Sequence, residues 1–323
     1  MCMRMRTFAL LGLLGASFSI ATASFDLMLL NRYDASTNFS RIHRYDPVSG
    51  AYLGSFASGI QVTRIAVNPT NSEVYAYDSN NSTIRAYNYN TGAFLRSYFA
   101  STGITDMVVS NDGTTILHST GSTVIRGMDL TTGAYSNLVT GTGTTGFYRL
   151  ALHRNGTLYA AGDTVSLSQF APSGSNYVQI QVTTLSGVSS ASAATQMAVQ
   201  YPDVGSSLGY VAIGQGSSFG YNYFGSTGNL LNIGGTQPAG QISSMSVMLN
   251  SHAGYYGLGV DLLNSSQVRL NSYDVAGVPI ETKILPFQIG NPNAGAIVLA
   301  PEPGTMIALA AGIGVLARRR RKK

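Results

Sequence analysis

The sequence predicts an all-β fold built from a repeated four-stranded unit. Only 10% of its 323 residues are charged and 37 are Gly, which disfavours a helix-rich fold and charged disorder. Apolar strands and glycine-containing turns recur every 41 to 54 residues, and both ends of the repeated region carry an incomplete unit. Four strands in a repeat of this length are typical of a β-propeller blade, so we predict a six-bladed β-propeller.

The outer half of each unit is a hairpin in which two strands flank a short polar turn. Its clearest copies span residues 42–56, 83–99 and 124–139. The turn glycines of the six copies are Gly50, Gly92, Gly133, Gly174, Gly228 and Gly277. Glycine suits such turns because it adopts positive φ without steric cost.

The inner half of each unit is a second pair of strands. Its copies span residues 63–79, 105–121, 148–164, 195–216 and 243–262. Turn-forming residues separate the two strands in the clearest copies, as Asn68-Pro69, Asn111-Asp112-Gly113 and Asn155-Gly156.

The two ends of the repeated region predict how the fold closes. Residues 25–33 align with the second strand of a unit, so the first blade lacks its innermost strand. Residues 294–301 match the innermost strands but have no blade of their own. We predict that they complete the first blade, a strand exchange that removes an open edge. The alternatives are an open β-solenoid and a pair of sandwiches.

The N-terminal segment, residues 1–23, reads as a secretory signal peptide that signal peptidase removes. Arg4 and Arg6 precede an apolar run of about 13 residues, which as a helix spans about 20 Å and is short for a ~30 Å bilayer core. Ala21 and Ala23 form the small-residue cleavage motif. Cleavage after Ala23 removes the only cysteine, Cys2, and leaves residues 24–300 as the predicted propeller domain.

The C-terminal segment, residues 301–323, has three parts in a defined order. Pro301, Glu302 and Pro303 come first, and an apolar run of about 14 residues follows, which spans about 21 Å as a helix. The chain ends in the basic cluster Arg318, Arg319, Arg320, Arg321, Lys322 and Lys323. Such a helix can lodge in a membrane, with the basic cluster stopping transfer on the cytoplasmic side.

The order of this tripeptide, apolar helix and arginine cluster resembles the PEP-CTERM sorting signal of Gram-negative bacteria. The resemblance implies recognition by an exosortase, transient anchoring through the helix, and delivery to the cell surface or extracellular matrix. A plain membrane tail anchor is the alternative. The body is similar to NHL and YVTN-type propellers in its Asn-Pro turn followed by Val-Tyr-Ala-Tyr, and it lacks the Trp-Asp dipeptide of WD repeats.

The distribution of charge excludes a nucleic-acid-binding role. The chain carries a net charge of +5, but eight of its 19 basic residues lie in the two terminal segments. The remaining 11 basic residues accompany 13 of the 14 acidic ones. The body therefore offers no basic stripe to neutralise phosphates.

The body shows no recognisable catalytic or metal-binding pattern. Most carboxylates recur at turn positions, among them Asp46, Asp78, Asp129 and Asp163. The four histidines, His43, His118, His153 and His252, stand at unrelated repeat positions. We predict no catalytic residue, no metal ligand and no cofactor.

One constellation remains when the innermost strands are aligned. The residue before each apolar core position is Arg64, Asp106, Arg149, Gln196, Ser244 and Ala296. In a propeller these positions gather near the central channel. One interpretation is an Arg-Asp-Arg ion network between blades; the other is a small anionic ligand held by Arg64 and Arg149.

These observations favour an exported, non-enzymatic binding or structural protein, with extracellular polysaccharide and surface proteins as candidate partners. The alternative is an extracellular lyase or hydrolase acting on matrix polysaccharide. A protein-binding module is a third hypothesis, with the insertions at Tyr201–Ser207 and Ser251–Tyr256 as contact loops.

Overall fold

The computed structural model describes strands and loops across most of the body. The described residues are 27–34, 39–46, 51–140, 146–153, 155–162, 166–184, 194–200, 209–215, 218–224, 230–236, 242–249, 255–261, 268–273, 279–285 and 295–300. The side chains described are those of residues 41–46, 51–139, 146–153, 155–162, 166–182 and 197. Several predicted functional residues lie outside the described residues: Ala21, Ala23, Pro301, Glu302, Pro303, Arg318, Arg319, Arg320 and Arg321.

Residues Phe25–Pro301 form one compact unit, in which the described strands make six four-stranded sheets. The first sheet contains β1 (Leu27–Asp34), β2 (Phe39–Tyr45), β3 (Tyr52–Ile60) and β24 (Gly295–Ala300). The second contains β4 (Val62–Val67), β5 (Glu73–Asp78), β6 (Thr83–Asn88) and β7 (Phe94–Phe99). The third contains β8 (Asp106–Val109), β9 (Thr115–Ser119), β10 (Val124–Asp129) and β11 (Tyr135–Thr140).

The other three sheets repeat the same pattern. The fourth contains β12 (Phe147–Leu152), β13 (Leu158–Gly162), β14 (Ser166–Ser173) and β15 (Asn176–Thr184). The fifth contains β16 (Ala194–Gln200), β17 (Gly209–Gln215), β18 (Ser218–Phe224) and β19 (Leu230–Thr236). The sixth contains β20 (Ile242–Leu249), β21 (Tyr255–Asp261), β22 (Val268–Tyr273) and β23 (Pro279–Leu285).

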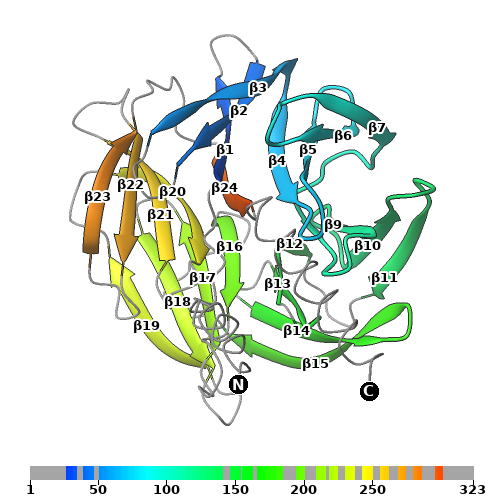
Figure 1. Cartoon of the computed structure of the whole chain (residues 1–323). Helices are drawn as coiled ribbons and strands as arrows, with labels where there is room; N and C mark the ends of the chain where they lie inside the picture. The colour runs from blue at the N-terminus through cyan, green and yellow to red at the C-terminus, as the bar shows by residue number, and fades with distance from the viewer. Residues whose placement is uncertain are drawn as a thin grey trace, which may run out of the picture. The chain divides into compact units, whose positions relative to one another are not determined.

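Every pairing between neighbouring strands is antiparallel, and five sheets follow chain order from inside to outside. The first sheet differs, because β24 lies beside β1 with Leu30 opposite Ile297. The innermost strands touch their neighbours in the order β4, β8, β12, β16, β20 and β24, and β24 touches β4 in turn. Figure 1 shows β7, β11, β15, β19 and β23 on the outside of this unit. The predicted all-β, propeller-like fold of four-stranded antiparallel sheets is thereby confirmed.

The turns form as the sequence predicts wherever they are described. Gly92, Gly133 and Gly174 adopt φ of 77°, 72° and 61°. Before Gly133, the Asp129 carboxylate accepts the backbone N–H groups of Thr131 and Thr132 at 2.9 and 2.7 Å. This side-chain turn leaves only glycine comfortable at the following position. Gly50, Gly228 and Gly277 lie outside the described residues.

The hydrophobic core lies between neighbouring sheets rather than within any one of them. Each buried cluster contains residues of two neighbouring sheets. Ile42 of the first sheet packs with Ile65 of the second, Tyr77 of the second with Met107 of the third, and Leu117 of the third with Leu150 of the fourth. A single four-stranded sheet cannot bury both faces alone, so each sheet depends on the next.

The inner turns also connect neighbouring sheets by hydrogen bonds. Asn68 Nδ2 donates to the Gly113 carbonyl at 3.0 Å, and Asn111 Nδ2 donates to the His153 carbonyl at 2.8 Å. These asparagines, expected from the sequence only as turn formers, therefore hold the second, third and fourth sheets in order. In the described ranges no helix is long and apolar enough to cross a membrane.

Candidate functional site

The aligned polar residues of the innermost strands do occupy equivalent positions. A β-bulge precedes Arg64 in β4, Arg149 in β12 and Gln196 in β16. Asp106 opens β8 and pairs with Ser119. The side chain of Gln196 lies outside the described residues.

Arg64, Asp106 and Arg149 come together around one backbone carbonyl. Arg64 Nε and Arg149 Nη1 both donate to the Thr105 carbonyl oxygen, at 2.5 and 2.9 Å. The buried Asp106 carboxylate accepts the Leu150 N–H across the sheet boundary at 2.8 Å. Three innermost strands are thus joined by charged side chains that bond mainly to backbone.

Burial dominates the electrostatics of this cluster. It raises the pKa of Asp106, which nearby Arg149 and Arg64 pull in the opposite direction. Burial and repulsion from Arg64 lower the pKa of Arg149 to about 10, and burial lowers that of Arg64. Because the charges are engaged by main-chain groups, the contacts favour the structural interpretation over an anion site.

The other candidate residues that the structure describes lie in the interior of the fold. Asp78 is fully buried and pairs with Arg85 at 3.0 Å. His43, His118 and His153 are buried, and His252 lies outside the described residues. No group of three or more His, Cys, Asp or Glu side chains that could hold a metal ion occurs among the described residues.

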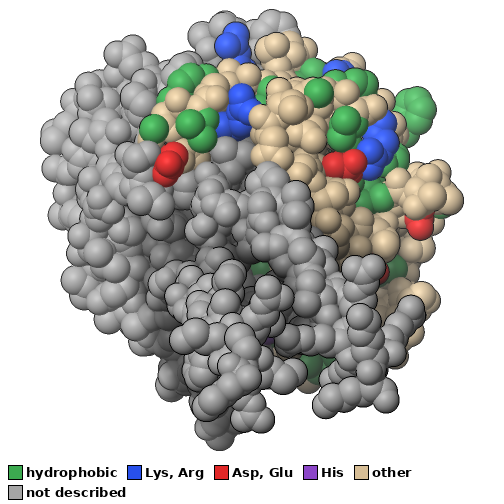
Figure 2. Space-filling view, viewed as in Figure 1, with side chains coloured by type: hydrophobic (Ala, Val, Ile, Leu, Met, Phe, Trp, Pro, Cys, Tyr) green, Lys and Arg blue, Asp and Glu red, His purple; other side chains and the backbone are tan. Residues whose placement is uncertain are grey.

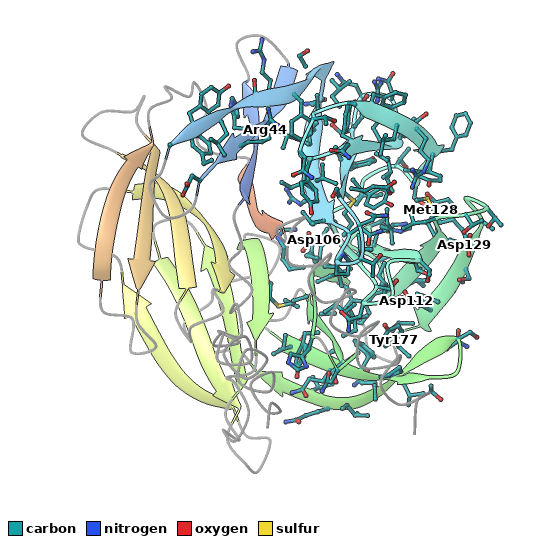
Figure 3. All side chains as sticks on the ribbon, viewed as in Figure 1. Arg44, Asp106, Asp112, Met128, Asp129 and Tyr177 are labelled. Carbon is teal, nitrogen blue, oxygen red and sulfur yellow. The ribbon has the colours of Figure 1, made fainter. Side chains whose placement is uncertain are left out.

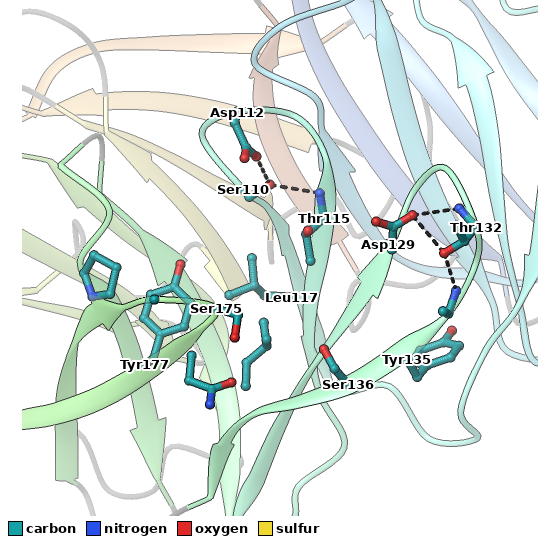
Figure 4. A pocket seen from close by; sticks show the side chains of 15 residues that line it. Ser110, Asp112, Thr115, Leu117, Asp129, Thr132, Tyr135, Ser136, Ser175 and Tyr177 are labelled. Carbon is teal, nitrogen blue, oxygen red and sulfur yellow. Dashed lines mark hydrogen bonds between the residues drawn. The ribbon is translucent and has the colours of Figure 1, made fainter.

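A more open site lies between the third and fourth sheets (Figure 4). A cleft of about 480 Å³ separates the face formed by β9, β10 and β11 from the hairpin of β14 and β15. Its volume falls within the usual range of small-molecule sites. Figure 3 places Asp112, Asp129 and Tyr177 in this outer region, away from Asp106 near the innermost strands.

Two carboxylates border the cleft, and each is held by its own turn. Asp112 Oδ1 accepts the Ser110 hydroxyl at 2.6 Å and the Thr114 N–H at 3.1 Å. These bonds, the Ser110 hydroxyl first, lower the pKa of Asp112. The N–H and hydroxyl of Thr132 lower the pKa of Asp129. Both groups are therefore ionised at neutral pH, and their bonds leave Oδ2 as an acceptor.

Two tyrosines supply the aromatic surface of the cleft. The Tyr135 hydroxyl donates to the Phe99 carbonyl at 2.7 Å, and the ring meets buried His118 edge-on at 5.5 Å. Tyr177 lies on the opposite wall in Figure 4. Burial, and then the charge of Asp112, raise the pKa of Tyr177. The orientation of Tyr135 is thus set by contacts made without a ligand.

Gly127 lies behind one wall of the cleft, where the Leu138 side chain occupies the space that a Cβ atom at Gly127 would take. Gly127 lies opposite Leu117 on β9 and Ser136 on β11, and both of these residues line the cleft. A Cβ atom at Gly127 would lie 2.6 Å from Leu138 Cδ1, so even alanine would push that wall.

Sequence reasoning drew attention to the centre of the fold and missed this outer cleft. The available signal was a comparison across repeats, in which Thr115 and Ser136 stand where the second repeat has Glu73 and Arg96. The loss of that charged pair is conspicuous only once the cross-strand neighbours are known.

The charged side chains of the described surface are scattered. In Figure 2 a few blue and red side chains lie among green and tan surface, and at the right a blue side chain adjoins a red one. No continuous basic stripe is visible on the described part of this face.

Comparisons with known proteins bear on the fold alone. No protein-family model and no curated protein matches the chain. Among solved structures, it is similar to a protein of unknown function from Bacteroides caccae, with 14% identity, 86% of this chain and 99% of that chain covered, and a TM-score of 0.57. It is also similar to a protein from Lactobacillus plantarum, with 12% identity, 84% of this chain and 98% of that chain covered, and a TM-score of 0.57. Its similarity to hydrazine synthase from Kuenenia stuttgartiensis has 13% identity, covers 72% of each chain and gives a TM-score of 0.50.

Proposed function

We propose that this chain is an exported bacterial protein of the cell surface or extracellular matrix, whose body is a closed six-bladed β-propeller with a binding or structural role. The six four-stranded sheets support the number of blades. The pairing of β24 with β1, together with contacts that run from each innermost strand to the next, supports closure. A closed ring leaves no open sheet edge for unwanted pairing outside the cell.

The proposed export route rests on the two terminal segments. Residues 1–23 direct secretion, and residues 301–323 present the tripeptide, apolar helix and basic cluster to an exosortase. The helix holds the chain in the inner membrane until processing releases the body. Signal peptidase and the exosortase are therefore the partners expected during maturation.

One observation carries the proposal, namely where the last strand ends. Strand β24 closes the first sheet and ends at Ala300, directly before Pro301. Processing at or after the tripeptide consequently leaves the whole ring intact. Processing before Ala300 would remove part of the strand that completes the first blade.

The binding or structural role is supported by the way the described charges are used. Arg64, Asp106 and Arg149 serve mainly backbone groups, and the carboxylates at turns serve their own loops. The chain is therefore proposed as a non-enzymatic module.

Intact mass of the mature protein, with cell fractionation, tests the proposal in hosts with and without the exosortase. We expect a chain that starts near Ser24 and loses Arg318–Lys323 only when the enzyme is present, recovered from the surface or matrix fraction. A chain that keeps Arg318–Lys323 in both hosts would make the tail a simple anchor and overturn the sorting proposal.

A further inference from the structure

We propose that the cleft between the third and fourth sheets binds a neutral saccharide through Tyr135, Tyr177, Asp112 and Asp129. The inference rests on the proposed binding role of the body and names the class of ligand.

In the second sheet, the position equivalent to the cleft is filled by an ion pair. Ala86 is the counterpart of Gly127, because it lies opposite Tyr75 and Arg96 as Gly127 lies opposite Leu117 and Ser136. Arg96 binds both carboxylate oxygens of Glu73, at 2.8 and 2.7 Å. The neighbouring Tyr98 hydroxyl then donates to the Leu130 carbonyl of the third sheet at 2.7 Å.

In the first sheet, a single arginine fills the equivalent space. Arg44 donates to the Leu53 carbonyl at 3.2 Å and to the Asn90 carbonyl of the second sheet. Its guanidinium also lies 5.9 Å from the centre of the Phe56 ring. Both preceding boundaries between sheets are therefore bridged by the protein's own side chains.

At the boundary between the third and fourth sheets the filling residues are replaced by small ones. Thr115 stands where Glu73 stands in the second sheet, since each lies opposite the last residue of the next strand. Ser136 replaces Arg96 and Gly127 replaces Ala86. Of the three boundaries between sheets whose side chains the structure describes, this is the one that no charged side chain fills.

The lining of the cleft matches the chemistry of a neutral sugar. Tyr135 and Tyr177 offer ring faces for the apolar C–H face of a pyranose. Asp112 and Asp129 offer ionised acceptors for sugar hydroxyl donors, and such charge-assisted hydrogen bonds are stronger than neutral ones. No Lys or Arg is among the lining residues that the structure describes. Two carboxylates without a cation disfavour an anionic sugar.

The cleft is also organised before a ligand arrives. The turns hold both carboxylates through Oδ1, and the Phe99 carbonyl holds Tyr135. Groups that are already ordered lose little entropy on binding, which favours affinity in a shallow, open site.

The test is binding of the purified full-length chain, in detergent, to an array of defined hexasaccharides. The neutral probes are built from glucose, mannose, galactose or N-acetylglucosamine, and hexagalacturonate is the anionic probe. Because the chain need not be processed, the result is independent of export and sorting. We expect binding to at least one neutral hexasaccharide and none to hexagalacturonate.

Three variants locate the binding site. Asp129→Asn removes the charge but keeps the turn, because Asn88 makes the same turn in the second sheet, and we expect binding to weaken about tenfold or more. Thr115→Glu combined with Ser136→Arg installs the ion pair of the second sheet and is expected to abolish binding. Ile180→Ser is the control, since Ile180 is exposed on β15 and does not line the cleft.

Three outcomes would overturn the inference. They are the absence of binding to every neutral hexasaccharide, binding to hexagalacturonate alone, and binding that the two cleft variants leave unchanged. Circular dichroism of each variant establishes that it is folded. Failure of this test with normal surface sorting would reject the ligand class and leave the proposed function in place.

Discussion

Acidification should destabilise the body through His118. The ring is fully buried, neither nitrogen has a hydrogen-bond partner among the described residues, and Arg126 lies close enough to disfavour a positive charge. Burial first and Arg126 second lower the pKa of His118 from 6.5 to about 4. The folded chain therefore takes up a proton at His118 less readily than the unfolded chain does.

The size and sign of the effect follow from that difference. Well above pH 6.5 the imidazole is neutral in both states and does not affect the free energy of unfolding. As the pH falls toward 4, His118 becomes protonated in the unfolded chain but stays mostly neutral in the folded chain. The free energy of unfolding therefore decreases. A shift of this size corresponds to a loss of about 3 kcal/mol, complete near pH 4.

The comparison uses His118→Leu, which replaces the ring by an apolar side chain that needs no hydrogen bond. Urea unfolding followed by far-ultraviolet circular dichroism gives the free energy of unfolding of both proteins at pH 7, 6, 5 and 4. The variant should match or exceed the wild type at pH 7 and be more stable by about 3 kcal/mol at pH 4. Titrating carboxylates affect both proteins alike and cancel in the difference. Parallel pH profiles would refute the reasoning.

Three further predictions concern stability, each measured by urea unfolding. Gly113→Ala should lower the free energy of unfolding by about 2 to 5 kcal/mol, because the φ of this residue is +72° and the new Cβ would lie 2.1 Å from the Thr70 hydroxyl oxygen. The control is Gly103→Ala, which has a similar φ of +74° but open space around it, and which should cost only about 1 to 2 kcal/mol. Equal losses in the two variants would contradict the packing argument. Asp106→Asn should lose about 1 to 3 kcal/mol, because it leaves the buried Arg149 and the partly buried Arg64 without the nearby negative charge of Asp106. An unchanged midpoint would show that the carboxylate is dispensable. A double-mutant cycle on Glu73 and Arg96 should give a coupling free energy below about 1 kcal/mol, because Arg96 is 40% exposed to solvent. The coupling should decrease in 1 M salt, which screens exposed charges. A larger coupling that salt does not change would contradict this prediction.

The sequence was sufficient to predict the repeated unit because its turns are chemically distinctive. Gly92 and Gly133 recur with the same spacing from their strands, and each needs positive φ. The alignment of innermost strands was also informative, since it brought Arg64 and Arg149 to the same carbonyl. The residues at the turns and the spacing of the repeats are therefore enough to predict most of the propeller-like fold.

The sequence could not show which groups those arginines would serve, because the Thr105 carbonyl lies in a loop whose position depends on packing. It likewise could not reveal the cleft. The opening lies where Thr115 and Ser136 take the places that Glu73 and Arg96 have in the second sheet. Cross-strand register, which includes a bulge in β10 and β11, decides which residues face each other.

The central claim is a ring closed by the last strand, and a designed disulfide tests it most directly. In the full-length chain with Cys2→Ser, Leu30→Cys and Ile297→Cys would place two cysteines at directly opposed positions of β1 and β24 (Figure 1). Opposed residues of antiparallel strands lie about 4.5 to 5.5 Å apart at Cα, within reach of a disulfide. We expect intact mass to show that the opposed pair forms an intramolecular disulfide almost completely. The control combines Leu30→Cys with Leu299→Cys, which is two residues out of register, and should form little disulfide. Free, alkylatable thiols in the opposed pair would contradict closure of the ring by β24.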